Sequence, residues 1–305
     1  MGLGPRSAWR GGTRSPVLAG IGLMLIGVAM FSFGDVLGKL IVKTYSVGQL
    51  LLLRAGAALL MLSPLIWRHR ADFIHLERPW LQLFRVVLST LEVAAFFFAV
   101  AVLPLADVTT YYLACPIFVT ALSAVFLGER VGWRRWSAVV AGFCGVLIAL
   151  QPSTQTLTWP ALIALGGSLS FSVLMLLTRS LRATPDIVLA SAQFIGTLVF
   201  GVVLAPFGWA PPGWHSLGFF AAAGWISVCA LFCVNRSLKL APASSVVPYQ
   251  YSMIIWAVML GYLVFGDVPS AATLTGAAII VAAGLYIFLR EQALGRSEAV
   301  VSPPV

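Results

Sequence analysis

Residues 104–129 read PLADVTTYYLACPIFVTALSAVFLGE, and residues 242–267 read PASSVVPYQYSMIIWAVMLGYLVFGD. Each segment begins with proline, has a tyrosine seven residues later and ends in a glycine followed by an acidic residue. The second segment starts 138 residues after the first, which indicates an internal repeat. The corresponding positions are Pro104 and Pro242, Tyr111 and Tyr249, Gly128 and Gly266, and Glu129 and Asp267.

The composition around this repeat is that of a membrane protein. Of the 305 residues, 60% are hydrophobic and only 10% charged, which is too few charges for the surface of a soluble domain. An apolar helix needs about 20 residues to cross about 30 Å of hydrocarbon. The apolar runs are unbroken, so they favour helices over the alternating strands of a membrane barrel. Ten such spans are predicted, at 17–43, 47–67, 80–103, 105–127, 134–151, 159–181, 186–207, 215–239, 242–265 and 271–290.

Five of these spans fall into each repeat, and an odd number of crossings places the second repeat upside down relative to the first. We therefore predict an all-α integral membrane protein of ten transmembrane helices, arranged as two inverted five-helix repeats around a central cavity. This architecture is typical of alternating-access transporters. The predicted units are a cytoplasmic tail at 1–16, a first repeat at 17–151, a second, inverted repeat at 159–290 and a cytoplasmic tail at 291–305.

Basic residues lie in alternate loops, and this pattern predicts the orientation. Both tails and the second, fourth, sixth and eighth connections contain arginine, whereas the intervening loops, apart from Lys43, have no lysine or arginine. By the positive-inside rule both termini are cytoplasmic. The net charge of +9 is therefore a topology signal rather than a nucleic-acid patch. Sixteen arginines against three lysines, with abundant alanine, glycine and valine, indicate a GC-rich genome and a bacterial inner membrane.

In both repeats a helix, a turn of glycine and an acidic residue and a small-residue-rich last helix follow one another. In this the chain resembles the drug/metabolite transporter superfamily of the EamA type, from about residue 17 to 290, and within it the bacterial aromatic amino acid exporters of the YddG type. The resemblance implies ten helices around a cavity lined by spans 1, 3, 4, 6, 8 and 9. Pro116 lies in the middle of span 4 and Pro248 near the start of span 9, so the halves need not kink alike.

Ionisable residues inside the spans are candidates for function because burying a charge in a bilayer is costly. Glu92 lies at the midpoint of its span and shares a helix face with Arg85. Its carboxyl group either binds and releases a proton during transport or has a structural role, such as pairing with Arg85.

Asp35 and Lys39 are four residues apart in the first span, where they can form an ion pair on one face. Such a pair either neutralises two costly groups or presents complementary charges to a zwitterionic substrate. Arg54 and Asp107 lie toward the outer side of their spans, so they are expected to snorkel or pair near the interface.

Aromatic and small polar residues in the spans are candidates for lining the pathway. Tyr111 and Tyr249 are related by the repeat, and several serines and tryptophans lie at helical spacing. Serine hydroxyls in spans also bond the backbone, and aromatic residues also pack helices together. The pathway candidates of this type are Tyr111, Tyr249, Trp225, Ser245, Ser252, Trp256, Ser168 and Ser172.

The predicted function is export of amino acids, with aromatic and bulky neutral ones favoured, or of related small metabolites. A broad-specificity drug/metabolite exporter and a passive channel remain as alternatives. An enzyme is not expected, because His69, His75 and His215 lie in or beside loops, away from any nucleophile in the spans. The four cysteines lie inside spans, so no metal or cofactor is predicted. The coupling ion, the direction of flux and the oligomeric state stay open.

Overall fold

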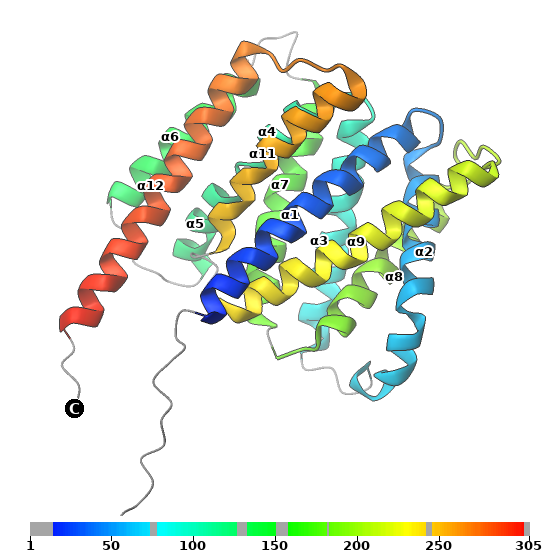
Figure 1. The fold of residues 1–305 in the computed structure, drawn as a ribbon, viewed down its shortest axis with the longest axis horizontal. Helices are drawn as coiled ribbons and strands as arrows, with labels where there is room; N and C mark the ends of the chain where they lie inside the picture. The colour runs from blue at the N-terminus through cyan, green and yellow to red at the C-terminus, as the bar shows by residue number, and fades with distance from the viewer. Residues whose placement is uncertain are drawn as a thin grey trace, which may run out of the picture.

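The structure is a computed structural model, and it describes residues 15–73, 78–126, 133–150, 158–181, 183–241 and 246–301. These residues form helices and no strand (Figure 1). The helices are α1 (Ser15–Val42), α2 (Val47–Arg68), η1 (Arg70–Phe73), α3 (Pro79–Val100), α4 (Leu105–Tyr112), α5 (Cys115–Phe126), α6 (Trp133–Leu150), α7 (Trp159–Ser180), α8 (Asp186–Leu204), α9 (Trp214–Leu240), η2 (Val247–Ser252), α11 (Met253–Leu260), η3 (Gly261–Phe265) and α12 (Ala271–Val301).

Within the described part of the chain, six helices are long and apolar enough to cross a membrane, namely α1, α2, α3, α7, α8 and α9. Shorter apolar helices occupy the other predicted spans. For the described residues, the prediction of an all-helical fold with membrane-length apolar helices is therefore confirmed. The number of ten crossings and the inversion of the second half stay predictions.

The predicted fourth span is broken in two. Helix α4 ends at Tyr112, and α5 begins at Cys115. Pro116 explains the break, because proline has no N–H to donate to the carbonyl four residues earlier, which is that of Tyr112. The predicted ninth span has a different shape, since it runs from the 3₁₀ helix η2 through α11 into the π-helical turn η3. The two segments therefore kink differently, as their proline positions predict.

Helix α12 continues to Val301, past the expected end at 290. Residues 290–301 read REQALGRSEAVV, and most of them are good helix formers. The segment predicted as the start of a tail therefore extends the last helix.

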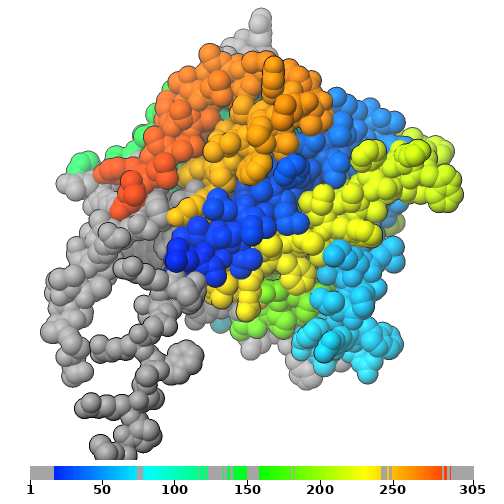
Figure 2. Space-filling model, in the orientation of Figure 1, coloured from blue at the N-terminus to red at the C-terminus, as the bar shows by residue number. Residues whose placement is uncertain are grey.

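Neighbouring helices pack in pairs that are distant in sequence. The most extensive contacts are those of α1 with α9, α6 with α12, α2 with α8, and α3 with α7. Figure 1 shows α12 beside α6 at one side of the bundle, and in Figure 2 α1 (blue) lies between α11 (orange) and α9 (yellow). We refer to the end of the bundle where α1 begins and α9 ends as the N-terminal end, and to the opposite end as the distal end.

Exposed tryptophans lie at both ends of the bundle. Trp67 in the last turn of α2 and the first-turn tryptophans of α3 and α6 belong to the N-terminal end, and those that begin α7 and α9 belong to the distal end. Trp67, Trp80, Trp133, Trp159 and Trp214 are between 74% and 89% exposed. Tryptophan is enriched at the two membrane–water interfaces, so these positions fit a bundle that spans a bilayer.

Candidate functional site

A cavity lies inside the bundle between α1, α2, α3, α7, α8 and α9, and it also reaches the end of α4, η2 and α11. It comprises about 1280 Å³ of space between atoms, part of which is open to the exterior. Its walls are mainly apolar, with aromatic side chains from five helices. These aromatic residues are Phe31, Phe96, Phe97, Tyr112, Phe171 and Phe194.

Four charged residues also line this cavity, although they come from only three helices. Asp35 comes from α1, Arg54 from α2, and Arg85 and Glu92 from α3. Bringing two carboxylates and two guanidinium groups into an apolar interior is costly unless each finds a partner. Their contacts therefore determine what the cavity can bind.

Arg54 is held by α9 and α3 through neutral groups. Its Nε and Nη2 both donate to the Ser227 hydroxyl oxygen, at 2.9 and 2.6 Å. Its guanidinium lies over the Phe97 ring, 4.9 Å from the centroid, where the negative face of the ring attracts it. With 7% exposure Arg54 is a buried residue of the cavity wall, not an interfacial one, so the expectation of a snorkelling arginine is wrong.

Asp35 and Glu92 line the same cavity without a direct partner. Within the described residues neither carboxylate has a hydrogen bond or an ion pair, and their charges interact with that of Arg54 only at longer range. The predicted pair of Asp35 with Lys39 is not formed. Lys39 lies one turn nearer the distal end, where its long side chain reaches Asp267, with Nζ 2.7 Å from Oδ2.

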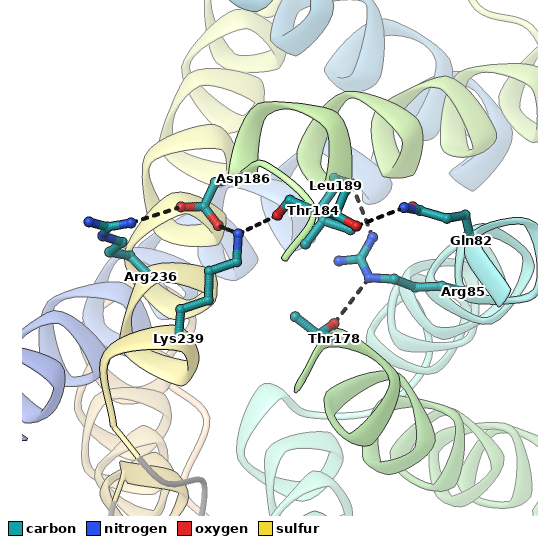
Figure 3. A network of polar contacts seen from close by, with 8 residues as sticks. All are labelled: Gln82, Arg85, Thr178, Thr184, Asp186, Leu189, Arg236 and Lys239. Atoms are coloured by element: carbon teal, nitrogen blue, oxygen red, sulfur yellow. Dashed lines mark hydrogen bonds and ion pairs between the residues drawn. The ribbon is translucent and has the colours of Figure 1, made fainter. Parts of the chain in front are cut away.

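Arg85 forms hydrogen bonds with α7 and α8 rather than with Glu92. Its Nε donates to the Thr178 hydroxyl at 3.0 Å and its Nη1 to the Leu189 carbonyl at 3.0 Å (Figure 3). Its Nη2 lies 3.5 Å from Oε1 of Gln193. It is 1% exposed. The alternative that Arg85 pairs with Glu92 is therefore wrong, because Arg85 instead ties α3 to α7 and α8.

A second set of polar contacts lies next to Arg85, at the N-terminal end of the bundle (Figure 3). Lys239 of α9 pairs with Asp186 at the start of α8, with Nζ 2.5 Å from Oδ1, and also donates to the Thr184 carbonyl at 2.6 Å. Gln82 of α3 donates to the Thr184 hydroxyl at 3.0 Å. The turn between α7 and α8 thus holds the ends of α3 and α9 together.

The predicted aromatic candidates lie around the cavity rather than in its wall. Tyr111 is buried in the apolar core, and its neighbour Tyr112 lines the cavity instead. Trp225 is 53% exposed on α9, and Trp256 packs on Phe33 with ring centroids 5.8 Å apart. Tyr249 is partly buried in a second apolar cluster. The two tyrosines related by the repeat therefore pack in the apolar core, and their neighbours Tyr112 and Gln250 line the cavity.

The serine candidates mostly bond the backbone. Ser172 donates to the Ser168 carbonyl at 2.7 Å, and Ser252 donates to the Tyr249 carbonyl at 2.7 Å. Both Ser168 and Ser172 are buried, outside the cavity wall. Ser245 lies outside the described residues. Of the ten predicted site residues that the structure describes, only Asp35 and Glu92 line the cavity.

Several polar residues of the wall were missed by the sequence reasoning. Gln193 of α8, Ser227 and Asn235 of α9 and Gln250 of η2 all line the cavity. Arg54 carried a signal that was available. An arginine inside an apolar span with no acidic residue on its own helix needs a partner from another helix.

Comparisons with known proteins agree with this architecture. A model of the EamA-like transporter family matches residues 18–151 and 158–289. An S-adenosylmethionine uptake transporter of Rickettsia felis is 24% identical over 278 residues, which cover 90% of this chain and 94% of the relative. A riboflavin transporter of Rhizobium johnstonii is 31% identical over 246 residues, or 80% of this chain and 82% of the relative.

A pseudopaline exporter of Pseudomonas aeruginosa is 26% identical over 272 residues, which cover 86% of this chain and 94% of the relative. None of these three relatives is named for amino acid export. A solved crystal structure superimposes on 92% of this chain, and on 98% of its own, with a TM-score of 0.60 and 15% sequence identity. This likeness shows a shared fold.

Proposed function

We propose, from the fact that this chain belongs to the EamA-like transporter family, that it carries a small metabolite with a flat ring across a bacterial inner membrane by alternating access. The observation that carries the proposal is the cavity inside a bundle of membrane-length helices, which combines aromatic walls with carboxylates that lack direct partners. A solute bound there would lie between the two ends of the bundle.

The aromatic walls support a substrate with a flat ring. Phe96 makes edge-to-face contacts with both Phe97 and Tyr112, and the Tyr112 ring lies 6.2 Å from that of Phe171 between centroids. Offset or T-shaped ring pairs contribute about 0.5–1.5 kcal/mol each beyond area burial. Among the relatives' solutes, S-adenosylmethionine and riboflavin each contain a flat heteroaromatic ring system. Aromatic amino acids are a narrower hypothesis within this class.

Two features support an inverted repeat as the moving framework. The family model matches twice, once in each half. If the halves are exchanged, helix by helix, the α1–α9 pair becomes the α7–α3 pair, while α2 with α8 and α6 with α12 map onto themselves. Helix pairing of this kind is expected of two equivalent five-helix units related by a two-fold axis. The arginine-rich loops support a cytoplasmic location of both termini.

An ion pair at each end of the bundle is consistent with alternating access. Lys39 and Asp267 pair at the distal end, and Lys239 and Asp186 pair at the N-terminal end. For the cavity to open at one end, the ion pair at that end must break while the other holds. The relatives include an uptake transporter and an exporter, so the direction of transport is part of the test.

Transport by purified protein in liposomes tests this function. Labelled S-adenosylmethionine, riboflavin, tryptophan, phenylalanine and alanine should be offered in both directions. We expect at least one ring-bearing solute to move faster than alanine. Val93→Trp should block this movement because Val93 lines the cavity, whereas Val87→Trp on the exposed side of the same helix should not. Equal rates for alanine and the ring-bearing solutes, or full transport through Val93→Trp, would contradict the proposal.

A further inference from the structure

Within the described residues, four charged groups line one cavity without a direct partner of opposite charge, and the charges of three of them, Asp35, Arg54 and Glu92, interact with one another. No nitrogen of Arg54 lies within 4.0 Å of a carboxylate oxygen of Asp35 or Glu92. Asp35 and Arg54 are each only 7% exposed. A buried charge without a close counter-charge is costly, so a ligand that supplies the missing charges would be stabilised there.

We propose that the cavity recognises a dipolar substrate, whose cationic group binds between Asp35 and Glu92 and whose carboxylate binds Arg54. This inference rests on the proposed transport function, since it names the charge class of the solute in the same cavity. In this proposal Arg54 binds the substrate carboxylate, a role that the sequence had suggested for Lys39. Lys39 is already paired with Asp267.

The hydrogen bonds of Arg54 leave part of its guanidinium available. Nε and Nη2 share one acceptor, the Ser227 hydroxyl, which in turn donates to the Ala223 carbonyl at 2.6 Å. Among the described residues no acceptor is bound to Nη1. Guanidinium groups form strong, charge-assisted hydrogen bonds with carboxylates. Phe97 below the guanidinium holds it in place for such a contact.

The two carboxylates favour a cation. Asp35 and Glu92 come from α1 and α3, and their negative charges interact with each other as well as with Arg54. An ammonium or other cationic group between them would relieve this repulsion and supply hydrogen bonds to both. Arg85 is held apart from these carboxylates, because its Nε, Nη1 and Nη2 donate to Thr178, Leu189 and Gln193.

The net charge of Asp35, Glu92 and Arg54 predicts which charged group of the ligand contributes more to its affinity. Arg54 is the cationic residue whose charge interacts with Asp35 and Glu92, so these three groups together carry one excess negative charge when all three are ionised. A ligand that loses its cation is therefore expected to lose more affinity than one that loses its carboxylate. This ordering separates the inference from a cavity that selects by ring shape alone.

The test measures affinity of the purified protein for three probes with the same ring. L-Tryptophan has both charges, L-tryptophanamide has only the ammonium, and N-acetyl-L-tryptophan has only the carboxylate. We expect tryptophan to bind about 10-fold tighter than tryptophanamide, and N-acetyltryptophan to bind weakest. Binding of N-acetyltryptophan as tight as that of tryptophanamide, or no binding by any probe, would overturn the inference.

Variants assign the two contacts separately. Arg54→Gln should remove the preference for tryptophan over tryptophanamide. Asp35→Asn and Glu92→Gln should each lower the affinity for both of these probes by about 10-fold. Asp72→Asn, on the exposed helix η1, is the matched control and should change neither. The comparison between probes within one variant does not depend on how much of that variant is folded. An unchanged preference in Arg54→Gln would refute the carboxylate contact.

The result can be separated from that of the transport assay. Transport of ring-bearing solutes without this charge ranking leaves the proposed function standing and overturns the inference. Binding with the expected ranking but no movement across the liposome membrane supports the inference and contradicts the transport proposal.

Discussion

Gly224 of α9 allows α9 to pack closely against α2 beside Arg54. Gly224→Ala should therefore lower both the thermal stability of the protein and its affinity for ligands that bind Arg54. A Cβ atom at this position would lie 2.5 Å from the Arg54 carbonyl oxygen and 3.1 Å from the Ala58 nitrogen, both in α2. Ordinary contacts begin at 3.4 Å, so the helices must separate by about 0.9 Å. Backbone atoms cannot move aside as a flexible side chain can.

The separation acts directly on Arg54. Ser227 lies three residues after Gly224, and its bonds to Arg54 are 2.9 and 2.6 Å long. Lengthening each by about 0.9 Å would take both beyond the usual limit of about 3.2 Å for N–H···O bonds. A hydrogen bond to a charged group contributes about 1.5–3 kcal/mol. We therefore expect weaker binding of carboxylate ligands in this variant.

Gly218→Ala is the matched control, because Gly218 lies on the same helix with nothing within 4 Å of an added Cβ. Both variants gain the same helix propensity, so their difference isolates the overpacking cost, about 1–3 kcal/mol. Thermal unfolding in detergent should show Gly224→Ala melting lower, by about 2–4 °C for each kcal/mol. Equal melting temperatures and equal affinities for the two variants would refute the reasoning.

Three further predictions follow from the loops, Glu92 and the ion pairs. Reporters active only in the periplasm should be active when fused near Gly208 and inactive near Arg70, and the reverse pattern would contradict both the orientation and the inverted repeat. If Glu92 carries a proton, Glu92→Gln should remove the pH dependence of transport in liposomes, since an amide cannot be protonated there; unchanged dependence would leave Glu92 without this role. Lys239→Met and Asp186→Asn should each lower the melting temperature, and the double variant should cost less than the sum of both; additive losses would show that the pair is not coupled.

The sequence was sufficient for the class of the fold. Long apolar spans predict membrane helices because backbone groups in lipid must be satisfied within each segment. The internal repeat indicates the family, and the different positions of Pro116 and Pro248 indicate that the two halves need not kink alike. These features depend on local chemistry and spacing along the chain. They could therefore be predicted without knowing which helices touch.

The site depended on contacts that only the tertiary structure decides. Periodicity placed Asp35 and Lys39 on one helix face, but the turn before α12 brings Asp267 to Lys39 and leaves Asp35 facing the cavity. The repeat selected Tyr111, whereas the rotation of α4 turns its neighbour Tyr112 inward. Partners of a buried charge come from helices far away in sequence, and the rotation of each helix about its axis selects among them. The sequence by itself determined that this chain forms membrane helices, and the packing of those helices determined which charges share the cavity.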